Sequence, residues 1–177
     1  MIGHRLMGTS LTCTGDIAQG RAHCNQALAL YDAAEHRPLA TRFGQDLGVS
    51  ILIWRSEALW LLGFPKAAVA DADHAVKDAR EIGQVATLMY ALYHASTCHI
   101  FSGNFAAANA LLNELVALAD KKDALLWKAF GVITRLAVGP DWQSLERYRN
   151  DYFGHQCVSV NGSKIVVATV FIIPRAR

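Results

Sequence analysis

The sequence predicts an all-α fold built from stacked helical hairpins, and three observations lead to this prediction. Residues 84–121 contain two stretches with apolar residues at helical spacing, separated by Ser102-Gly103-Asn104. The same pattern recurs in residues 4–34 and 39–83. Ala and Leu dominate most of the chain, which favours closely packed helices. Because one hairpin cannot bury both of its apolar faces, we expect the three hairpins to stack.

Glycines mark the predicted turns of the three hairpins. Gly15, Gly63 and Gly103 each follow the first apolar stretch of a hairpin. Pro65 begins the second helix of the second hairpin, where the first helical turn does not need its N–H. His36-Arg37-Pro38 predicts a break between the first and second hairpins. The predicted array comprises hairpins over residues 4–34, 39–83 and 84–121 and a single helix over residues 123–134.

The registers of these hairpins resemble those of the tetratricopeptide repeat. In that repeat a small residue lies midway along the first helix (helix A), a glycine closes it, and an alanine early in helix B allows close packing. The matching residues are Ser56, Gly63 and Ala68 in the second hairpin and Ser96, Gly103 and Ala108 in the third. Gly20 and Cys24 replace the usual alanine and aromatic residue in the first hairpin. The resemblance implies a short right-handed solenoid.

Three segments carry a more specific resemblance. GHRLMGTSL, AEHRPLATRFGQDLGV and ALWLLGFPKAAVADADHA are similar to the tetratricopeptide region that follows the ATPase module in bacterial adenylate/guanylate cyclase–ATPase fusion proteins. The similarity covers residues 2–134. It implies a truncated piece of a cytoplasmic signalling protein whose catalytic sites lie outside this chain. Met1 opens almost directly into a repeat helix, so we expect the reading frame to begin inside a longer protein.

The repeat pattern is lost in residues 135–177. Val158–Val160 and Lys164–Phe171, joined by Asn161-Gly162, fit a β-hairpin with its preferred turn dipeptide. A second interpretation is a frameshift near Arg135, because one choice of codons read one nucleotide later gives a further helical repeat. We therefore predict a non-repeat tail that is disordered, weakly β or out of frame, and the nucleotide sequence distinguishes these alternatives.

Charge and cysteine usage exclude several classes of protein. The net charge of +2 arises from 17 Lys and Arg against 15 Asp and Glu spread along the chain, so we expect no nucleic-acid partner and no attraction to a membrane surface. The four cysteines are widely spaced without a CxxC pair, which indicates reduced thiols in the cytoplasm. The most apolar run, Ile165–Ile173, is too short to span a bilayer as a helix.

One cluster contains residue types that bind metals. His94 and Cys98 share a helix face, whereas His99 lies about a hundred degrees away from them. No further ligand is spaced to join them, and a structural zinc site needs four. We therefore predict no metal site and interpret these residues as part of the helix core.

A second cluster contains residue types that catalyse proton transfer. Asp71, His74 and Asp78, with Asp73 beside them, have the spacing of the solvated face of a helix. The sequence also contains no GxxxxGK[ST], GxSxG, HExxH or GxGxxG motif. We therefore predict that the chain is not an enzyme and holds no cofactor.

The candidate binding site is a groove, because the repeat resemblance implies that the A helices line a concave face. Mapping that register nominates Arg5, Thr9, Ile53, Glu57, Trp60, Tyr90, Tyr93 and Thr97. Trp and Tyr are frequent anchors of partners. The alternative is that Trp60 and Tyr93 only fill space between neighbouring repeats.

Three hypotheses for function follow. The first is a non-catalytic scaffold that binds a protein segment or another domain of a larger parent protein. The second is a regulatory sensor that binds a small effector between repeats. The third is a non-functional gene remnant, which predicts poor solubility and self-association through exposed repeat ends, including the apolar residues Leu125, Leu126, Phe130 and Ile133.

Overall fold

The computed structural model describes residues 1–138, and all regular elements in that part of the chain are helices. The predicted all-α class is confirmed for these residues. The elements are α1 (Ile2–Thr14), α2 (Ile17–Ala29), α3 (Ala33–His36), the 3-10 helix η1 (Arg37–Leu39), α4 (Ala40–Phe43), α5 (Leu47–Leu61), α6 (Pro65–Ile82), α7 (Val85–Phe101), α8 (Phe105–Lys121) and α9 (Leu125–Val138). The chain divides after Gly131 into two compact units, and the packing described below lies within the first unit. Of the second unit, the described part is the end of α9.

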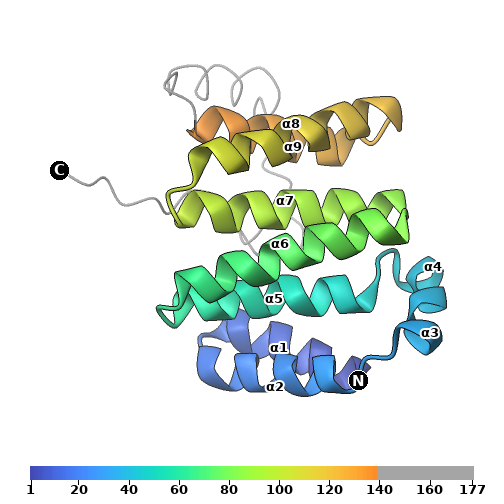
Figure 1. The fold of residues 1–177 in the computed structure, drawn as a ribbon, viewed down its shortest axis with the longest axis vertical. Helices are drawn as coiled ribbons and strands as arrows, with labels where there is room; N and C mark the ends of the chain where they lie inside the picture. The colour runs from blue at the N-terminus through green and yellow to red at the C-terminus, as the bar shows by residue number, and fades with distance from the viewer. Residues whose placement is uncertain (139–177) are drawn as a thin grey trace, which may run out of the picture. The chain divides into compact units, whose positions relative to one another are not determined.

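Long helices pair as hairpins, α1 with α2, α5 with α6 and α7 with α8 (Figure 1). Each pair is joined by a turn that contains a glycine in the left-handed region, with φ of 98° at Gly15, 84° at Gly63 and 77° at Gly103. Residues with a side chain rarely adopt this conformation without strain. The three turns lie at the glycines that the sequence predicted.

Successive hairpins contact one another through two sets of helix pairs. The second helix of one hairpin packs against the first helix of the next, as α2 does on α5 and α6 on α7. The first helices also contact each other, α1 with α5 and α5 with α7. The first helices of the three hairpins are therefore neighbours in space, and their common surface is called the helix-A face below.

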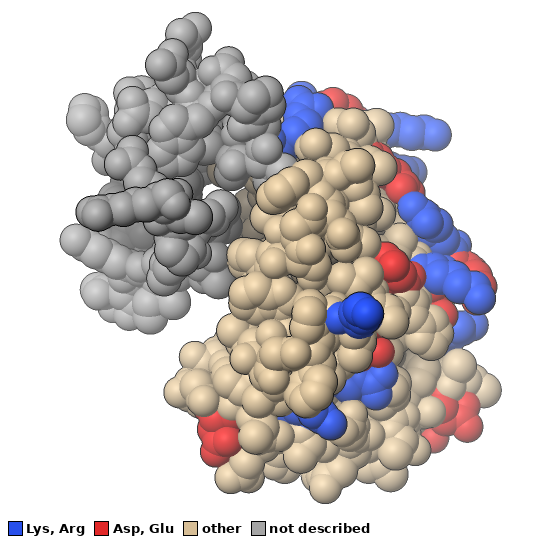
Figure 2. All heavy atoms as spheres, turned by 60° about the vertical axis from the view of Figure 1, so that its left-hand side comes forward, with Lys and Arg blue, Asp and Glu red and all other residues tan. Residues whose placement is uncertain are grey.

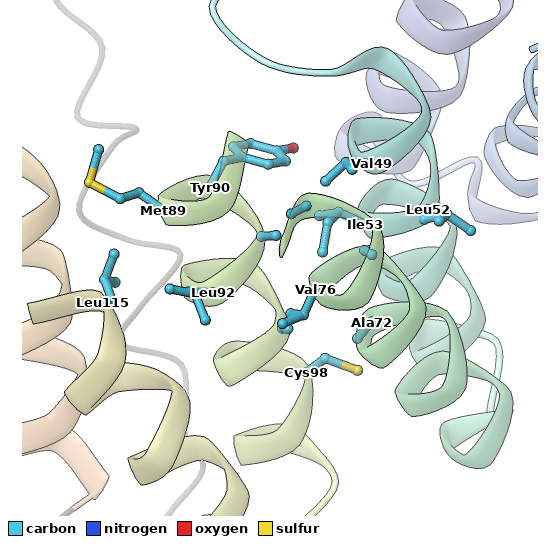
Figure 3. Close-up of a cluster of buried hydrophobic side chains, with 14 of the residues drawn as sticks. Val49, Leu52, Ile53, Ala72, Val76, Met89, Tyr90, Leu92, Cys98 and Leu115 are labelled. Atoms are coloured by element: carbon cyan, nitrogen blue, oxygen red, sulfur yellow. The ribbon is translucent and has the colours of Figure 1, made fainter. Parts of the chain in front are cut away.

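The main core lies between α5, α6, α7 and α8 (Figure 3). On α6 the core-facing positions carry alanines such as Ala72 and Ala75, which have no exposed surface and let the neighbouring helices approach. Ile53, Leu92 and Leu115 supply volume from three other helices and are also fully buried. Burying one side chain of this size contributes about 1.5–3 kcal/mol.

The first hairpin is packed in a different way, through backbone contact. A Cβ at Gly8 would lie 2.6 Å from Cys24 Sγ, and a Cβ at Gly20 would lie 3.0 Å from the Gly8 carbonyl oxygen. The two helices therefore approach closely because both residues lack side chains. Its fully buried apolar contact with the second hairpin is a small cluster of Cys24 and Ala27 with Ile51 of α5, against which the partly buried Met1, Leu28 and Trp54 pack.

The linker between the first two hairpins is fastened by Asp46, which is 1% exposed. Its carboxylate accepts hydrogen bonds from Val49 N at 3.0 Å, which caps α5, and from the Tyr31 hydroxyl at 2.9 Å. Its backbone N–H donates to Thr87 Oγ1 of α7 at 2.8 Å. The break predicted at His36-Arg37-Pro38 lies within short helices α3 and η1 of this linker.

Helix α9 begins with two strongly exposed leucines, Leu125 at 78% and Leu126 at 63%. It extends to Val138, four residues beyond the helix end expected from the sequence. The predictions of a β-hairpin at 158–171 and of a frameshifted tail fall in residues 139–177, outside the described residues. Among residues 1–138, no helix has both the length and the apolar character needed to cross a bilayer.

Candidate functional site

The helix-A face carries a cluster of aromatic rings centred on His94. The ring centroid of His94 lies 4.4 Å from that of Tyr90, 5.1 Å from that of Tyr93 and 6.3 Å from that of Trp54. His94 Nδ1 also lies 3.1 Å from Glu57 Oε1, which orients the imidazole. Residues from α5 and α7 thus form one continuous polar and aromatic surface.

Helix α9 extends this cluster with two more rings. Tyr93 stacks on Phe130 at a centroid distance of 5.2 Å and meets Trp127 edge-on at 6.1 Å. Trp127 and Phe130 are themselves 6.0 Å apart in a T-shaped arrangement. Tyr93, Trp127 and Phe130 are half-buried, so parts of these rings face solvent.

A set of polar groups lies at the other end of the face. Arg5 Nη1 of α1 and Gln45 Nε2 of the linker both donate to Ser50 Oγ of α5, at 3.2 and 3.3 Å. The Tyr90 side chain is 8% exposed, and its hydroxyl lies near Ser50 and Trp54. Burial raises the pKa of Tyr90, so this phenol stays neutral. Neither Arg5 Nε nor the Tyr90 hydroxyl makes a hydrogen bond of ordinary geometry, although both atoms are buried.

The structure brings together four of the eight groove residues named from the sequence. Arg5, Glu57, Tyr90 and Tyr93 lie on the surface just described. Ile53 is fully buried in the main core and offers no surface to a ligand.

The other three groove residues make contacts of their own. Trp60 packs against Phe101 near the turns, at a centroid distance of 5.0 Å. Thr9 and Thr97 donate to backbone carbonyls of their own helices, at Arg5 and Tyr93. Their hydroxyls are therefore already satisfied locally.

Four further residues belong to this surface and were not predicted from the sequence, namely Ser50, Trp54, His94 and Trp127. The helical register contained the signal for two of them, because Trp54 precedes Glu57 by three residues and His94 follows Tyr90 by four. Trp127 belongs to a helix outside the three hairpins, and no register argument connected it to Tyr93.

The cluster of His94, Cys98 and His99 is divided among separate contacts. His94 pairs with Glu57, whereas His99 Nε2 donates to Asp73 at 2.8 Å. Burial raises the pKa of the Cys98 thiol to about 11, which disfavours the thiolate that metals bind. Within the described residues, no three His, Cys, Asp or Glu side chains are placed to hold a metal ion.

The assignment of Asp71 to a solvated helix face is wrong. Arg55 donates to both Asp71 carboxylate oxygens, at 2.6 and 2.8 Å, and 14% of the Asp71 side chain is exposed. Asp71 therefore connects α6 to α5 through a bidentate ion pair, which is stronger than a single hydrogen bond. His74 and Asp78 do lie on an exposed helix side, 3.4 Å apart.

Surface hollows occur elsewhere, at the hairpin turns. One shallow pocket of about 300 Å³ lies between α2 and the turn residues Leu62 and Phe64, and another of about 360 Å³ lies between Lys66 of α6 and Asn104. None of the predicted groove residues lines either pocket.

Figure 2 shows charged side chains gathered along one side of the surface, with a broad uncharged surface beside them. Large apolar side chains near these turns are more than 40% exposed, namely Leu61, Phe64, Phe101 and Phe105.

Comparisons with known proteins were made at the level of family profiles, curated sequences and solved structures, and none of the three finds a match.

Proposed function

We propose that the chain is a non-catalytic helical-repeat scaffold of the tetratricopeptide type, a piece of a bacterial signalling protein of the cyclase–ATPase kind. It binds a protein segment or another domain of its parent protein on the helix-A face. The observation that carries this proposal is the group of half-buried rings around Tyr93. Aromatic side chains held by their neighbours supply contact area to a partner at little cost in conformational entropy.

The packing of small residues supports the tetratricopeptide part of the proposal. Ser56 and Ser96 lie midway along α5 and α7 and are at most 1% exposed, and Ala68 and Ala108, early in α6 and α8, are fully buried. In tetratricopeptide repeats these positions are small because helices A and B cross there. Contacts between neighbouring first helices, α1 with α5 and α5 with α7, fit the same scheme.

Binding of labelled peptides tests the proposal. A peptide library is screened against the full chain by fluorescence anisotropy, and hits are measured against Tyr93→Ala and Trp127→Ala. We expect each variant to weaken binding about 30-fold or more, as hot-spot aromatic residues do. Trp60→Ala, which removes a ring away from the cluster, is the matched control and should bind normally.

Two results would contradict the proposal. One is a hit whose affinity is unchanged in both Tyr93→Ala and Trp127→Ala, because binding would then occur elsewhere. The other is turnover of ATP or GTP by the purified chain, which a scaffold does not catalyse.

A small-effector sensor is a second candidate function, and the buried polar groups of Arg5, Ser50 and Tyr90 favour it. A buried donor without a partner costs about 1–3 kcal/mol, and a small anion that accepts from Arg5 and Tyr90 would offset that cost. Thermal-shift screening separates the candidates. Stabilisation by a metabolite, lost in Arg5→Met, supports the sensor, whereas stabilisation only by peptides supports the scaffold.

A further inference from the structure

The three hairpin turns lie along one edge of the first unit (Figure 1). Around the second and third turns this edge carries large apolar side chains that face solvent, with Phe64 51% and Phe105 52% exposed. Exposed apolar side chains gathered in one region are typical of surfaces that bind a partner. The turn edge, as this surface is called below, comprises Arg21 and Asn25 of α2, residues 61–69 and residues 101–105.

The two shallow pockets of the molecule occupy equivalent places along the turn edge. Each lies between the second helix of one hairpin and the turn of the next, α2 with the α5–α6 turn and α6 with the α7–α8 turn. Phe64 lines the first pocket and Pro65 lines the second, so the two pockets are neighbours. One partner segment that runs along the edge can therefore reach both.

Each pocket has one cation and no carboxylate among the described residues that line it. In the first, Arg21 lies over the Phe64 ring, 5.5 Å from its centroid, and in the second the cation is Lys66. Within residues 1–138 neither of these cations forms an ion pair, whereas Arg55 is neutralised by both carboxylate oxygens of Asp71. Carboxylates of a partner would complement the positive charge of the two pockets.

We propose that the turn edge binds a second protein segment, one that combines bulky apolar side chains with Asp or Glu. Its apolar side chains cover the Phe64 and Phe105 rings, and its carboxylates pair with Arg21 and Lys66. Two cations are too few for a nucleic-acid strand, whose affinity comes from many phosphate contacts. The proposal goes beyond the scaffold function, because none of the aromatic residues around His94 lines either pocket.

Binding of short acidic peptides to the full chain tests the proposal. The probes are fluorescein-labelled peptides that each contain two Leu, Phe or Trp residues flanked by Glu, and fluorescence anisotropy measures their affinity. We expect saturable binding that weakens about tenfold or more in Phe64→Ala, as for a ring at a hot spot. Peptides with Gln in place of Glu should bind more weakly, and raising the salt from about 50 to 300 mM should weaken binding of the acidic peptides.

Lys66→Glu separates loss of binding from loss of the fold. A Glu in the first turn of α6 interacts favourably with the helix dipole, so this variant should fold normally, which circular dichroism monitors. It places an anion at the second pocket and should weaken peptide binding about tenfold. Lys77→Glu is the matched control, because Lys77 is an exposed residue of the same helix, about 16 Å further along its axis. It should bind the peptides like the unaltered chain.

Three outcomes would overturn the proposal. In the first, no acidic peptide shows saturable binding up to about 1 mM. In the second, the affinity is unchanged in both Phe64→Ala and Lys66→Glu, which would place the peptide elsewhere. In the third, the Gln peptides or a single-stranded oligonucleotide bind as tightly as the acidic peptides, so that the partner is not an acidic protein segment.

Tyr93→Ala and Trp127→Ala distinguish this proposal from the scaffold function. Acidic peptides should bind both variants like the unaltered chain. Binding that is lost in Tyr93→Ala but kept in Phe64→Ala would overturn the turn-edge proposal and leave the helix-A face as the binding surface. Conversely, library peptides that require Tyr93 would support the scaffold function even if no acidic peptide binds the turn edge.

Discussion

The first hairpin, α1–α2, and the third, α7–α8, share a topology but are held together by different means. In the third hairpin Leu92, Leu112 and Leu115 have no exposed surface and belong to the main core. In the first, the largest fully buried side chain is that of Cys24, and the helices meet through glycines. The same fold unit can therefore be stabilised by hydrophobic volume or by close backbone approach.

This difference predicts unequal stability along the chain. Apolar burial contributes roughly 25 cal/mol per Å², and the fully buried apolar side chains of the first hairpin are Cys24 and Ala27, with the partly buried Met1 and Leu28 packed against them. Segments with few buried apolar contacts open at lower free energy than the core. We expect the first hairpin to open without the other two, and the following experiments test that expectation.

Leu92→Ala should give the largest effect. The side chain is fully buried in the main core, so its truncation leaves a cavity and should lower the free energy of unfolding by about 2–5 kcal/mol. Urea unfolding followed by circular dichroism measures this. Cys24→Ala, the counterpart in the first hairpin, should cost about 1 kcal/mol. Equal costs at the two sites would contradict the proposed difference.

Gly20→Ala should give the next largest effect. Its new Cβ would lie 2.9 Å from Thr12 N and 3.0 Å from the Gly8 carbonyl oxygen, so backbone must move apart. We expect a net loss of about 1–2 kcal/mol, since overpacking outweighs the gain in helix propensity. Gly3→Ala is the matched control in α1, with no atom within 4 Å of the new Cβ, and should stabilise by about 0.5–1 kcal/mol. Similar results for both variants would show that α1 and α2 are not closely packed.

Much of the fold was predictable because helical periodicity and turn glycines are local signals. The turns predicted at Gly15, Gly63 and Gly103 are confirmed. Glycine adopts positive φ more readily than other residues, so its position in the sequence indicates where such a turn can form. The close packing at Gly8 could not be predicted. The sequence shows that Gly8 lacks a side chain, but it does not show which neighbouring atoms occupy the space beside it. The role of Asp46 in fastening the linker to Thr87 depends on two residues far apart in sequence, and no local pattern reveals it.

The candidate site was predictable only in part, for a related reason. The resemblance to tetratricopeptide repeats placed Tyr90 and Tyr93 on a common surface with Glu57, but a repeat register cannot tell a lining position from a core position when the side chain is apolar. Ile53 was therefore included although it is buried. Asp71 was assigned to the solvated face because its partner, Arg55, lies on another helix. Pairings between helices need the three-dimensional structure.

Thiol labelling compares the two hairpins without changing their cores. In a Cys13→Ser, Cys157→Ser background, Cys24 reports on the first hairpin and Cys98 on the third, and both are buried. We expect Cys24 to react about tenfold faster than Cys98 in native buffer, since local opening exposes it at lower free energy. Mass spectrometry of digested protein gives the two rates. In urea the rates should converge, and equal rates in native buffer would mean that the hairpins open together.

The smallest effect is a loss of stability at alkaline pH. Burial raises the pKa of the Cys24 and Cys98 thiols from 9.0 to about 11. The unfolded chain releases these protons near pH 9, so the stability they contribute is present below pH 9 and is lost as the pH rises towards 11. Each thiol should account for about 1 kcal/mol of loss between pH 9 and 10.

The two thiols should differ in how this loss appears. Cys98→Ala should flatten the pH dependence of the main urea transition, because Cys98 lies in the cooperative core. Cys24→Ala should change that transition less. The first hairpin is expected to open before the main transition, so the Cys24 thiol loses its proton before that transition begins. If both variants flatten the pH dependence equally, Cys24 and Cys98 become exposed in one cooperative unfolding step. The glycine contacts of the first hairpin would then stabilise it as well as the buried leucines stabilise the third.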